Sequence, residues 1–162
     1  MMSSHSLAQT KNFIRKALWK LLDPDPPKSQ VDSLWLHFGR ACAYCGRILT
    51  REERKGHLDH LESSAELGRN HISNRVLACN LCNGDEKREI KWEHFLRSKC
   101  SNEEIYQARK MTIEKWRESC GPAPIIDEKL RSTVQESIER CTSVLDEEYK
   151  RLRTTALGNP GA

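Results

Sequence analysis

The chain has 162 residues and a net charge of +4, and charged side chains make up 31% of it. This length favours one domain with extensions, and the polar composition predicts a modest core that gains stability from a bound metal. The sequence has no run approaching the roughly 20 apolar residues of a membrane span and no apolar leader, so we expect no membrane association.

The first forty residues predict two helices separated by a proline-rich break. Residues 6–22 carry apolar side chains at helical spacing with basic side chains between them, which is typical of an amphipathic helix. The prolines within residues 23–27 end this helix, because proline lacks an amide donor and restricts the residue before it. Ser29 is placed to cap a second helix that ends near Gly39. We therefore expect residues 1–40 to form an N-terminal helical extension.

Four of the seven cysteines form two Cys-x-x-Cys hooks. Cys42 and Cys45 make the first hook, and Cys79 and Cys82 make the second. One tight turn presents both sulfurs of a hook to an ion, and four thiolates complete the tetrahedral shell that zinc prefers. A closed shell has no position for a substrate, so the sequence predicts a structural zinc site. Thiolates on zinc indicate a reducing compartment, and we expect a cytoplasmic protein.

The two hooks lie within a predicted core, residues 41–98. Residues 56–61 predict a short strand, residues 75–78 predict the returning strand, and the polar residues 62–74 predict the loop between them. The second hook then opens a helix, and residues 90–98 have a further helical pattern.

Two helices are predicted after this core. Residues 103–119, within a segment 99–121 expected to pack on the core, form the first. The long helix 127–152 lies within a C-terminal segment 122–162, whose end is a frayed tail. Its apolar stripe, at steps of three and four, consists of Leu130, Val134, Ile138, Cys141, Leu145, Tyr149 and Leu152. Two interpretations stay open: the stripe packs on its own domain, or it forms a seam for a partner or for self-association.

The segment between the hooks also carries a candidate catalytic group. The carboxylate of Asp59 and the amide oxygen of Asn83 are hard donors that suit Mg²⁺ or Mn²⁺. Adjacent side chains of a strand project to opposite faces, so His60 points away from the Asp59 side. A neutral imidazole with an ordinary pKa of about 6.5 takes a proton from water near neutral pH.

These residues resemble the HNH endonuclease family, in a zinc-containing variant that ends in Asn. The resemblance rests on Leu58-Asp59-His60-Leu61, on Ser73-Asn74-Arg75-Val76-Leu77-Ala78-Cys79 and on Cys82-Asn83. It implies an α+β, mostly helical fold, in which a ββα-metal HNH core with a four-cysteine structural zinc is flanked by N- and C-terminal helices. It also implies that Asn74 ties the loop and orients the imidazole. Many relatives place a lysine three residues after the final Asn, whereas Lys87 follows Asn83 by four.

The implied activity is metal-dependent hydrolysis of phosphodiester bonds in DNA. His60 would act as the general base, and Asp59 and Asn83 would hold one Mg²⁺ or Mn²⁺ ion. Contacts to the phosphates of the nucleic acid are expected from Arg75, Lys87 and Arg88.

Three further hypotheses remain beside this one, and one of them, a homing or restriction enzyme, is as open as the defence role below. The chain is alternatively a non-enzymatic zinc module that binds nucleic acid or a protein partner, because a zinc site alone does not imply catalysis. Small HNH proteins with helical extensions also resemble effectors of anti-phage defence systems, in which a companion ATPase restrains or delivers the nuclease. The terminal helices would then dock this partner or self-associate.

Overall fold

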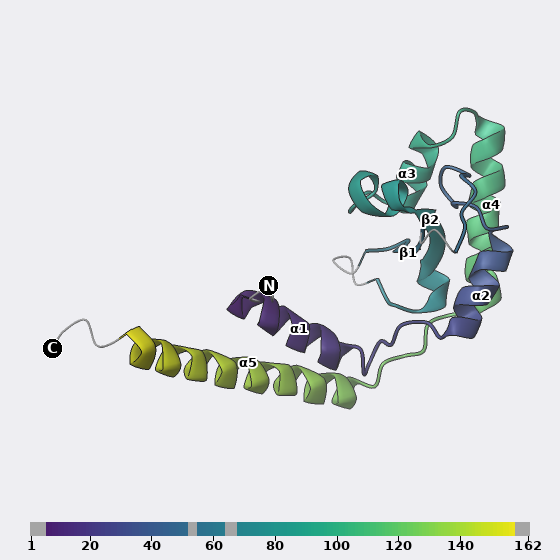
Figure 1. The fold of residues 1–162 in the computed structure, drawn as a ribbon. Coiled ribbons are helices and arrows are strands. Elements are labelled where there is room, and N and C mark those ends of the chain that lie inside the picture. Colours follow the sequence, from purple (N-terminus) through teal and green to yellow (C-terminus); the bar gives the residue numbers. More distant parts are fainter. Residues whose placement is uncertain (1–5, 52–54, 64–67, 158–162) are drawn as a thin grey trace. The chain divides into compact units, whose positions relative to one another are not determined.

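The computed structural model describes residues 6–51, 55–63 and 68–157 (Figure 1). Contacts divide the chain into two units, Asp25–Pro124 and the paired segments Met1–Pro24 and Ile125–Ala162. The predicted α+β class is confirmed, since helices predominate beside one two-stranded sheet in the described residues. None of the helices in these ranges is both long and apolar enough to cross a membrane.

The centre of the Asp25–Pro124 unit is an antiparallel hairpin of β1 (Gly56–His60) and β2 (Arg75–Cys79). The register pairs His60 with Arg75 and Gly56 with Cys79. All five residues of β2 are buried, because its apolar run is covered on both faces, while Asp59 is the buried residue of β1. Both predicted strands are therefore present, and their ends differ from the predicted ones by one residue.

Helices surround this hairpin. The short η2 (Ile72–Asn74) leads into β2, and the π-helical η3 (Cys82–Glu86) follows it. The α-helices of this unit are α2 (Lys28–His37), α3 (Trp92–Ser98) and α4 (Glu103–Cys120). Helix α4 contacts η2, where Trp116 donates its indole N–H to the carbonyl of Ile72 at 3.2 Å, and α2 contacts β2. The core is closed by a T-shaped pair of Tyr44 and Phe95, whose ring centroids lie 5.0 Å apart.

The start of α2 corrects one detail of the sequence analysis. The helix begins at Lys28, and the residue at its N-cap is Pro27, which makes no side-chain capping bond. Ser29 lies inside the first turn, so it is not the cap. Proline fits this position because its fixed backbone angle suits a helix start and its missing N–H has no helical partner there.

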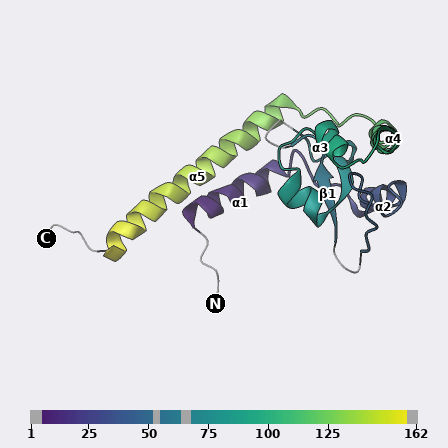
Figure 2. The same cartoon turned by 90° about the horizontal axis from the view of Figure 1, so that it is seen from above.

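The second unit consists of α1 (Leu7–Trp19) and α5 (Glu128–Leu157), which lie side by side in both views (Figures 1 and 2). Ser6 caps α1 and exchanges bonds with Gln9, a capping box. The small core of this unit is formed by Leu22, Val134 and Ile138, with Leu18, Trp19 and Ile126 packed around it.

This packing uses only part of the apolar stripe on α5. Val134 and Ile138 are buried, whereas Leu130, Tyr149 and Leu152 remain 49%, 47% and 55% exposed. An ion pair between Lys11 and Asp146 adds a polar contact between the two helices. Val134 and Ile138 therefore pack in the small core with Leu22, whereas Leu130 before them and Tyr149 and Leu152 after them present apolar surface.

Candidate active site

The first cysteine hook is a tight turn held by its own backbone. The Cys42 amide donates to the Arg47 carbonyl and the Gly46 amide to the Cys42 carbonyl, both at 2.8 Å. Gly46 has φ +75°, a conformation that side chains with a Cβ rarely adopt. From α4, the guanidinium of Arg109 donates to the carbonyls of Tyr44 at 2.7 Å and Cys45 at 3.2 Å. The turn is thus held by its own backbone hydrogen bonds and by the side chain of Arg109.

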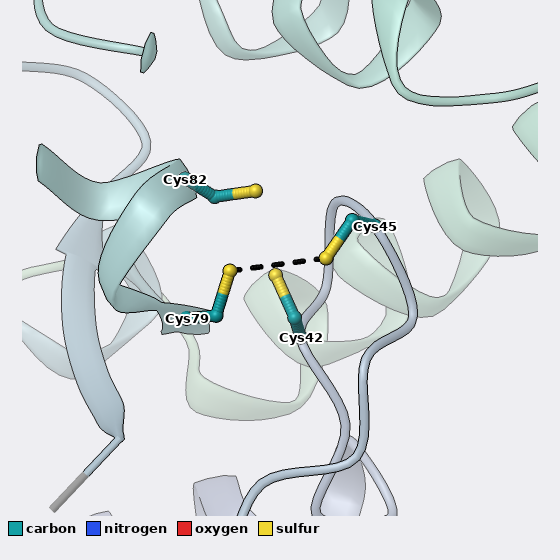
Figure 3. A group of neighbouring side chains, drawn as sticks. All are labelled: Cys42, Cys45, Cys79 and Cys82. Atoms are coloured by element: carbon teal, nitrogen blue, oxygen red, sulfur yellow. Dashed lines mark hydrogen bonds between the residues drawn. The ribbon is translucent and has the colours of Figure 1, made fainter. Parts of the chain in front are cut away.

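The second hook brings its sulfurs to the first (Figure 3). The sulfurs of Cys42, Cys45, Cys79 and Cys82 all lie within 4.8 Å of one another, and those of Cys45 and Cys79 are 3.8 Å apart. A tetrahedral ion at ~2.3 Å from each sulfur spaces the sulfurs by about 3.8 Å, so the donor set fits zinc. The thiol of Cys82 donates to Cys42 and lowers the pKa of Cys42 to about 5, which favours a thiolate. We call these four residues the four-cysteine site.

Beside this site, Asp59 lies buried on β1 with two donors on one oxygen. The Tyr44 hydroxyl donates to Oδ2 at 2.7 Å, and the ammonium of Lys87 lies 3.2 Å from the same atom. Lys87 is only 2% exposed and also donates to the carbonyl of His60 at 2.6 Å. Burial raises the pKa of Asp59, while Lys87 and Tyr44 act in the opposite direction. The predicted phosphate contact Lys87 is therefore engaged inside the protein.

The imidazole of His60 has a separate set of partners. Its Nε2 lies 3.0 Å from Oδ1 of Asn70, and its Nδ1 lies 3.1 Å from Nη1 of Arg75. Arg75 faces His60 directly across the hairpin and is 7% exposed. Burial lowers the pKa of His60, and the positive charge of Arg75 lowers it further. A neutral imidazole is thereby favoured at neutral pH.

Asn74 ties the loop between the strands. Its side-chain oxygen accepts from the Glu62 amide at 2.9 Å, and its side-chain nitrogen donates to the carbonyls of Glu62 at 3.0 Å and Arg69 at 2.9 Å. Asn74 is 7% exposed, so these bonds satisfy a buried amide. They join both ends of the loop that follows His60 in the chain.

Asn83 is half-buried in η3, which contacts β1. Lys87 follows at the end of this π-turn, which contains about one more residue than an α-turn. The ammonium of Lys87 lies 3.2 Å from Oδ2 of Asp59, which links the end of η3 to β1. A carboxylate and an amide oxygen are suitable donors for Mg²⁺ or Mn²⁺, so the chemistry of Asp59 and Asn83 fits such an ion. Arg88 is exposed and has φ +45°, where the turn ends.

A cavity of about 590 Å³ lies next to the loop that Asn74 ties. Arg69 and His71 line it from the loop, and Arg117 lines it from α4. Arg117 also pairs with Glu62 at 3.1 Å, so charges of both signs border the opening. This hollow therefore has charged side chains of both signs at its border and lies beside the loop that follows His60 in the chain.

Three partners in this arrangement were absent from the sequence analysis: Tyr44, Asn70 and Arg109. The sequence position of Tyr44 was informative, because the hook that contains it precedes β1 and must pack near that strand. Asn70 and Arg109 had none, because a polar loop residue and a helix arginine resemble ordinary surface positions. Only the fold brings them to the imidazole and to the hook.

A hairpin followed by a helical turn, with four cysteines placed to hold a metal ion at its ends, is a small ββα arrangement. Residues 42–89 match the family model of HNH endonucleases, and the match spans the four-cysteine site, the hairpin and η3. This segment is therefore similar to an HNH endonuclease domain, the family that the sequence resembles. No significant match was found among curated proteins or among solved structures.

Proposed function

We propose that the chain is a metal-dependent HNH endonuclease that hydrolyses phosphodiester bonds of DNA. The observation that carries this proposal is the pairing of Asp59 and His60 on one short strand, inside the segment that matches the HNH family. The two side chains have different partners, and each is held by a cation and a hydrogen bond. A carboxylate and a neutral imidazole at one site supply the two groups that hydrolysis by this route requires.

In this proposal the four-cysteine site holds a structural zinc ion, and Asp59 and Asn83 hold one Mg²⁺ or Mn²⁺ ion. When bound, that ion supplies positive charge to the phosphate and to the leaving oxygen. His60 accepts a proton from a water molecule, whose oxygen bonds to phosphorus while the bond to the leaving oxygen breaks. The leaving oxygen then takes a proton from solvent. Asn74 holds the loop behind the imidazole.

Arg75 and Arg88 are the arginines that we propose to meet the phosphates. Arg88 is exposed at the end of η3, so it needs no rearrangement to reach a phosphate. Arg75 must first leave His60. Guanidinium groups bind phosphate oxygens through two parallel hydrogen bonds, which a lysine does not match.

The test is cleavage of a supercoiled plasmid by the zinc-loaded protein, with Mg²⁺, with Mn²⁺ and with a chelator added in excess of either ion. His60→Ala should lower the cleavage rate by about 10²- to 10⁴-fold, the usual contribution of a general base. His57→Ala is the matched control, because His57 is exposed on the same strand. Equal zinc content in both variants shows that the four-cysteine site persists. Cleavage by His60→Ala at the control rate would reject His60 as the base.

A non-enzymatic zinc module is the second candidate. It is favoured by the surroundings of Asp59, which is only 8% exposed and whose Oδ2 already has Lys87 and Tyr44 as partners. Under this alternative the protein binds DNA in an electrophoretic mobility assay but leaves it intact with either metal. Metal-dependent cleavage that disappears in His60→Ala excludes this alternative.

The unit formed by α1 and α5 is our candidate for partner binding. The partner would be a companion ATPase of a defence system or a second copy of this chain. The half-exposed Tyr149 and Leu152 on α5 support this assignment. Light scattering after size exclusion separates the two options for the full chain. A concentration-independent monomer excludes self-association, whereas a dimer that Leu152→Glu dissociates supports it.

A further inference from the structure

The hydrogen bonds of Arg75 determine which ring nitrogen of His60 carries the proton. Nη1 of Arg75 lies 3.1 Å from Nδ1 of His60, and Nη2 donates to the side-chain oxygen of Asn70. A guanidinium group has donors and no acceptors, so each atom that it faces must offer a lone pair. Nδ1 of His60 is therefore unprotonated, and the Asn70 amide turns its oxygen towards Arg75.

This amide orientation fixes the other side of the imidazole. The same Asn70 oxygen lies 3.0 Å from Nε2 of His60. An amide oxygen only accepts, so Nε2 must carry the hydrogen that is donated to it. The neutral ring is therefore the Nε2–H tautomer, and Nδ1 is the nitrogen with basic character.

In the structure, however, that basic nitrogen is covered. The lone pair of Nδ1 already accepts from Arg75, so a water molecule has no access to it while this bond persists. Arg75 is kept in place by a further bond from Nη1 to the carbonyl of Leu58 at 3.2 Å. The imidazole is thus correctly protonated for a base and at the same time blocked.

We propose that Asn70 is a positioning residue that fixes the Nε2–H tautomer of His60, and that Arg75 covers Nδ1 until a phosphate group draws the guanidinium away. This inference rests on the proposed role of His60 as the base. Under this proposal, His60 accepts a proton only when substrate is bound, because the phosphate that draws Arg75 away is the group that water attacks.

The surroundings of Arg75 suit such a movement. Its Nη2 lies 4.0 Å from a carboxylate oxygen of Asp25, whose side chain is 54% exposed, so the guanidinium end lies near the protein surface. The bonds that it would leave include those to one imidazole nitrogen, one amide oxygen and two backbone carbonyls, of Leu58 and Asn70. These bonds join a cation to neutral acceptors, whereas a phosphate diester offers an anionic acceptor that the guanidinium binds through two parallel hydrogen bonds. After the proton reaches Nδ1, Asn70 still accepts from Nε2–H and stabilises the imidazolium.

The first test needs no substitution in the site. Long-range ¹H–¹⁵N spectra of zinc-loaded protein with ¹⁵N-labelled histidine report the tautomer of each of the six histidines, and a His60→Gln difference spectrum assigns the His60 signals. We expect Nε2 to be protonated and Nδ1 to be bare. A ring protonated at Nδ1 would overturn the inference, whether or not the protein cleaves DNA.

The second test adds a short DNA duplex without Mg²⁺ or Mn²⁺. The Nδ1 resonance of His60 should shift towards the value of an imidazole nitrogen that accepts no hydrogen bond. This shift on DNA binding should be lost in Arg75→Met. An Nδ1 resonance that stays in place while DNA binds would overturn the covering role of Arg75. These spectra do not depend on cleavage. The proposed roles of Asn70 and Arg75 and the proposed nuclease function can therefore be rejected independently.

Two variants of Asn70 test its positioning role. Asn70→Asp keeps an oxygen acceptor for Nε2–H, so the tautomer should persist. Asn70→Leu removes the acceptor, so both tautomers should appear and kcat should fall by roughly 10- to 100-fold with little change in KM, a part of the general-base contribution. An Asn70→Leu protein with a pure Nε2–H ring and wild-type kcat would overturn the role of Asn70.

Discussion

Removing the guanidinium of Arg109 should weaken zinc binding although this residue is not a ligand. Arg109→Met keeps an unbranched stem on α4 and removes every donor. The lost bonds run to the carbonyls of Tyr44 at 2.7 Å, Cys45 at 3.2 Å and Lys99 at 3.3 Å. Two of these carbonyls belong to the turn that presents the first hook to the ion. The turn therefore loses the contact that fixes it from outside.

The size of the effect follows from these contacts. Hydrogen bonds from a charged donor contribute about 1.5–3 kcal/mol each, and their effects are not additive. Tyr44 is fully buried, so its carbonyl has no ready replacement, whereas Cys45 is partly exposed and water can reach it. We expect the free energy of unfolding to fall by about 2–4 kcal/mol. Loss of an outer-shell partner typically lowers metal affinity by about 10- to 100-fold.

Competition for zinc with a chromophoric chelator measures the affinity, and urea unfolding followed by circular dichroism measures stability. Arg117→Met is the matched control, since Arg117 lies on the same helix and makes an exposed ion pair with Glu62. Such pairs contribute about 0–1 kcal/mol, and we expect unchanged zinc affinity in this variant. The reasoning is refuted if both variants hold zinc equally tightly.

Three further perturbations test the surrounding structure. Lys87→Met should lower the free energy of unfolding by about 3–5 kcal/mol in urea titrations, because it leaves Asp59 buried without its cation. Adding Asp59→Asn removes the unpaired charge and should restore part of this loss. Gly56→Ala should destabilise by about 1–3 kcal/mol in the same assay, because the new Cβ would lie 2.4 Å from the ring of Trp35; wild-type stability would show that the ring yields freely. Chelation of zinc should abolish the near-ultraviolet dichroism of the aromatic core, and an unchanged spectrum would show that this unit folds without metal.

The hairpin and the four-cysteine site were predictable because short-range rules determine them. A Cys-x-x-Cys turn places two sulfurs together whatever the remainder of the chain does. The apolar run before Cys79 indicates a strand covered on both faces, and the turn that follows the second hook is where Asn83 was expected. The predicted ends of these elements differ from the observed ones by one or two residues, as local patterns allow.

The partners of the catalytic candidates were less accessible to sequence analysis. Lys87 follows Asn83 by four residues, whereas the resemblance to HNH endonucleases led us to expect a lysine three residues after the Asn. The π-turn of η3 accommodates the additional residue and brings the ammonium to Asp59. Arg75 was expected at a phosphate, but strand register places it opposite His60. Neither the type of turn nor the register follows from spacing alone.

The pairing of α1 with α5 was also outside what the sequence indicated. Both helices showed clear amphipathic patterns, but a pattern names an apolar face without naming what covers it. The helices lie more than a hundred residues apart, and the buried set of Leu22, Val134 and Ile138 joins them. Local sequence patterns do not reveal contacts between residues this far apart in the chain.

Two cations act on the candidate site with opposite consequences for protonation. Lys87 stabilises the carboxylate of Asp59 and so opposes the rise in its pKa that burial causes. Arg75 opposes the charged form of His60 and so adds to the fall in its pKa that burial causes. Together they favour an ionised carboxylate beside a neutral imidazole, the combination that a metal ligand and a base require. Arg75 is the member of the pair with an exposed neighbour, and we therefore expect it, rather than the buried Lys87, to respond to the substrate.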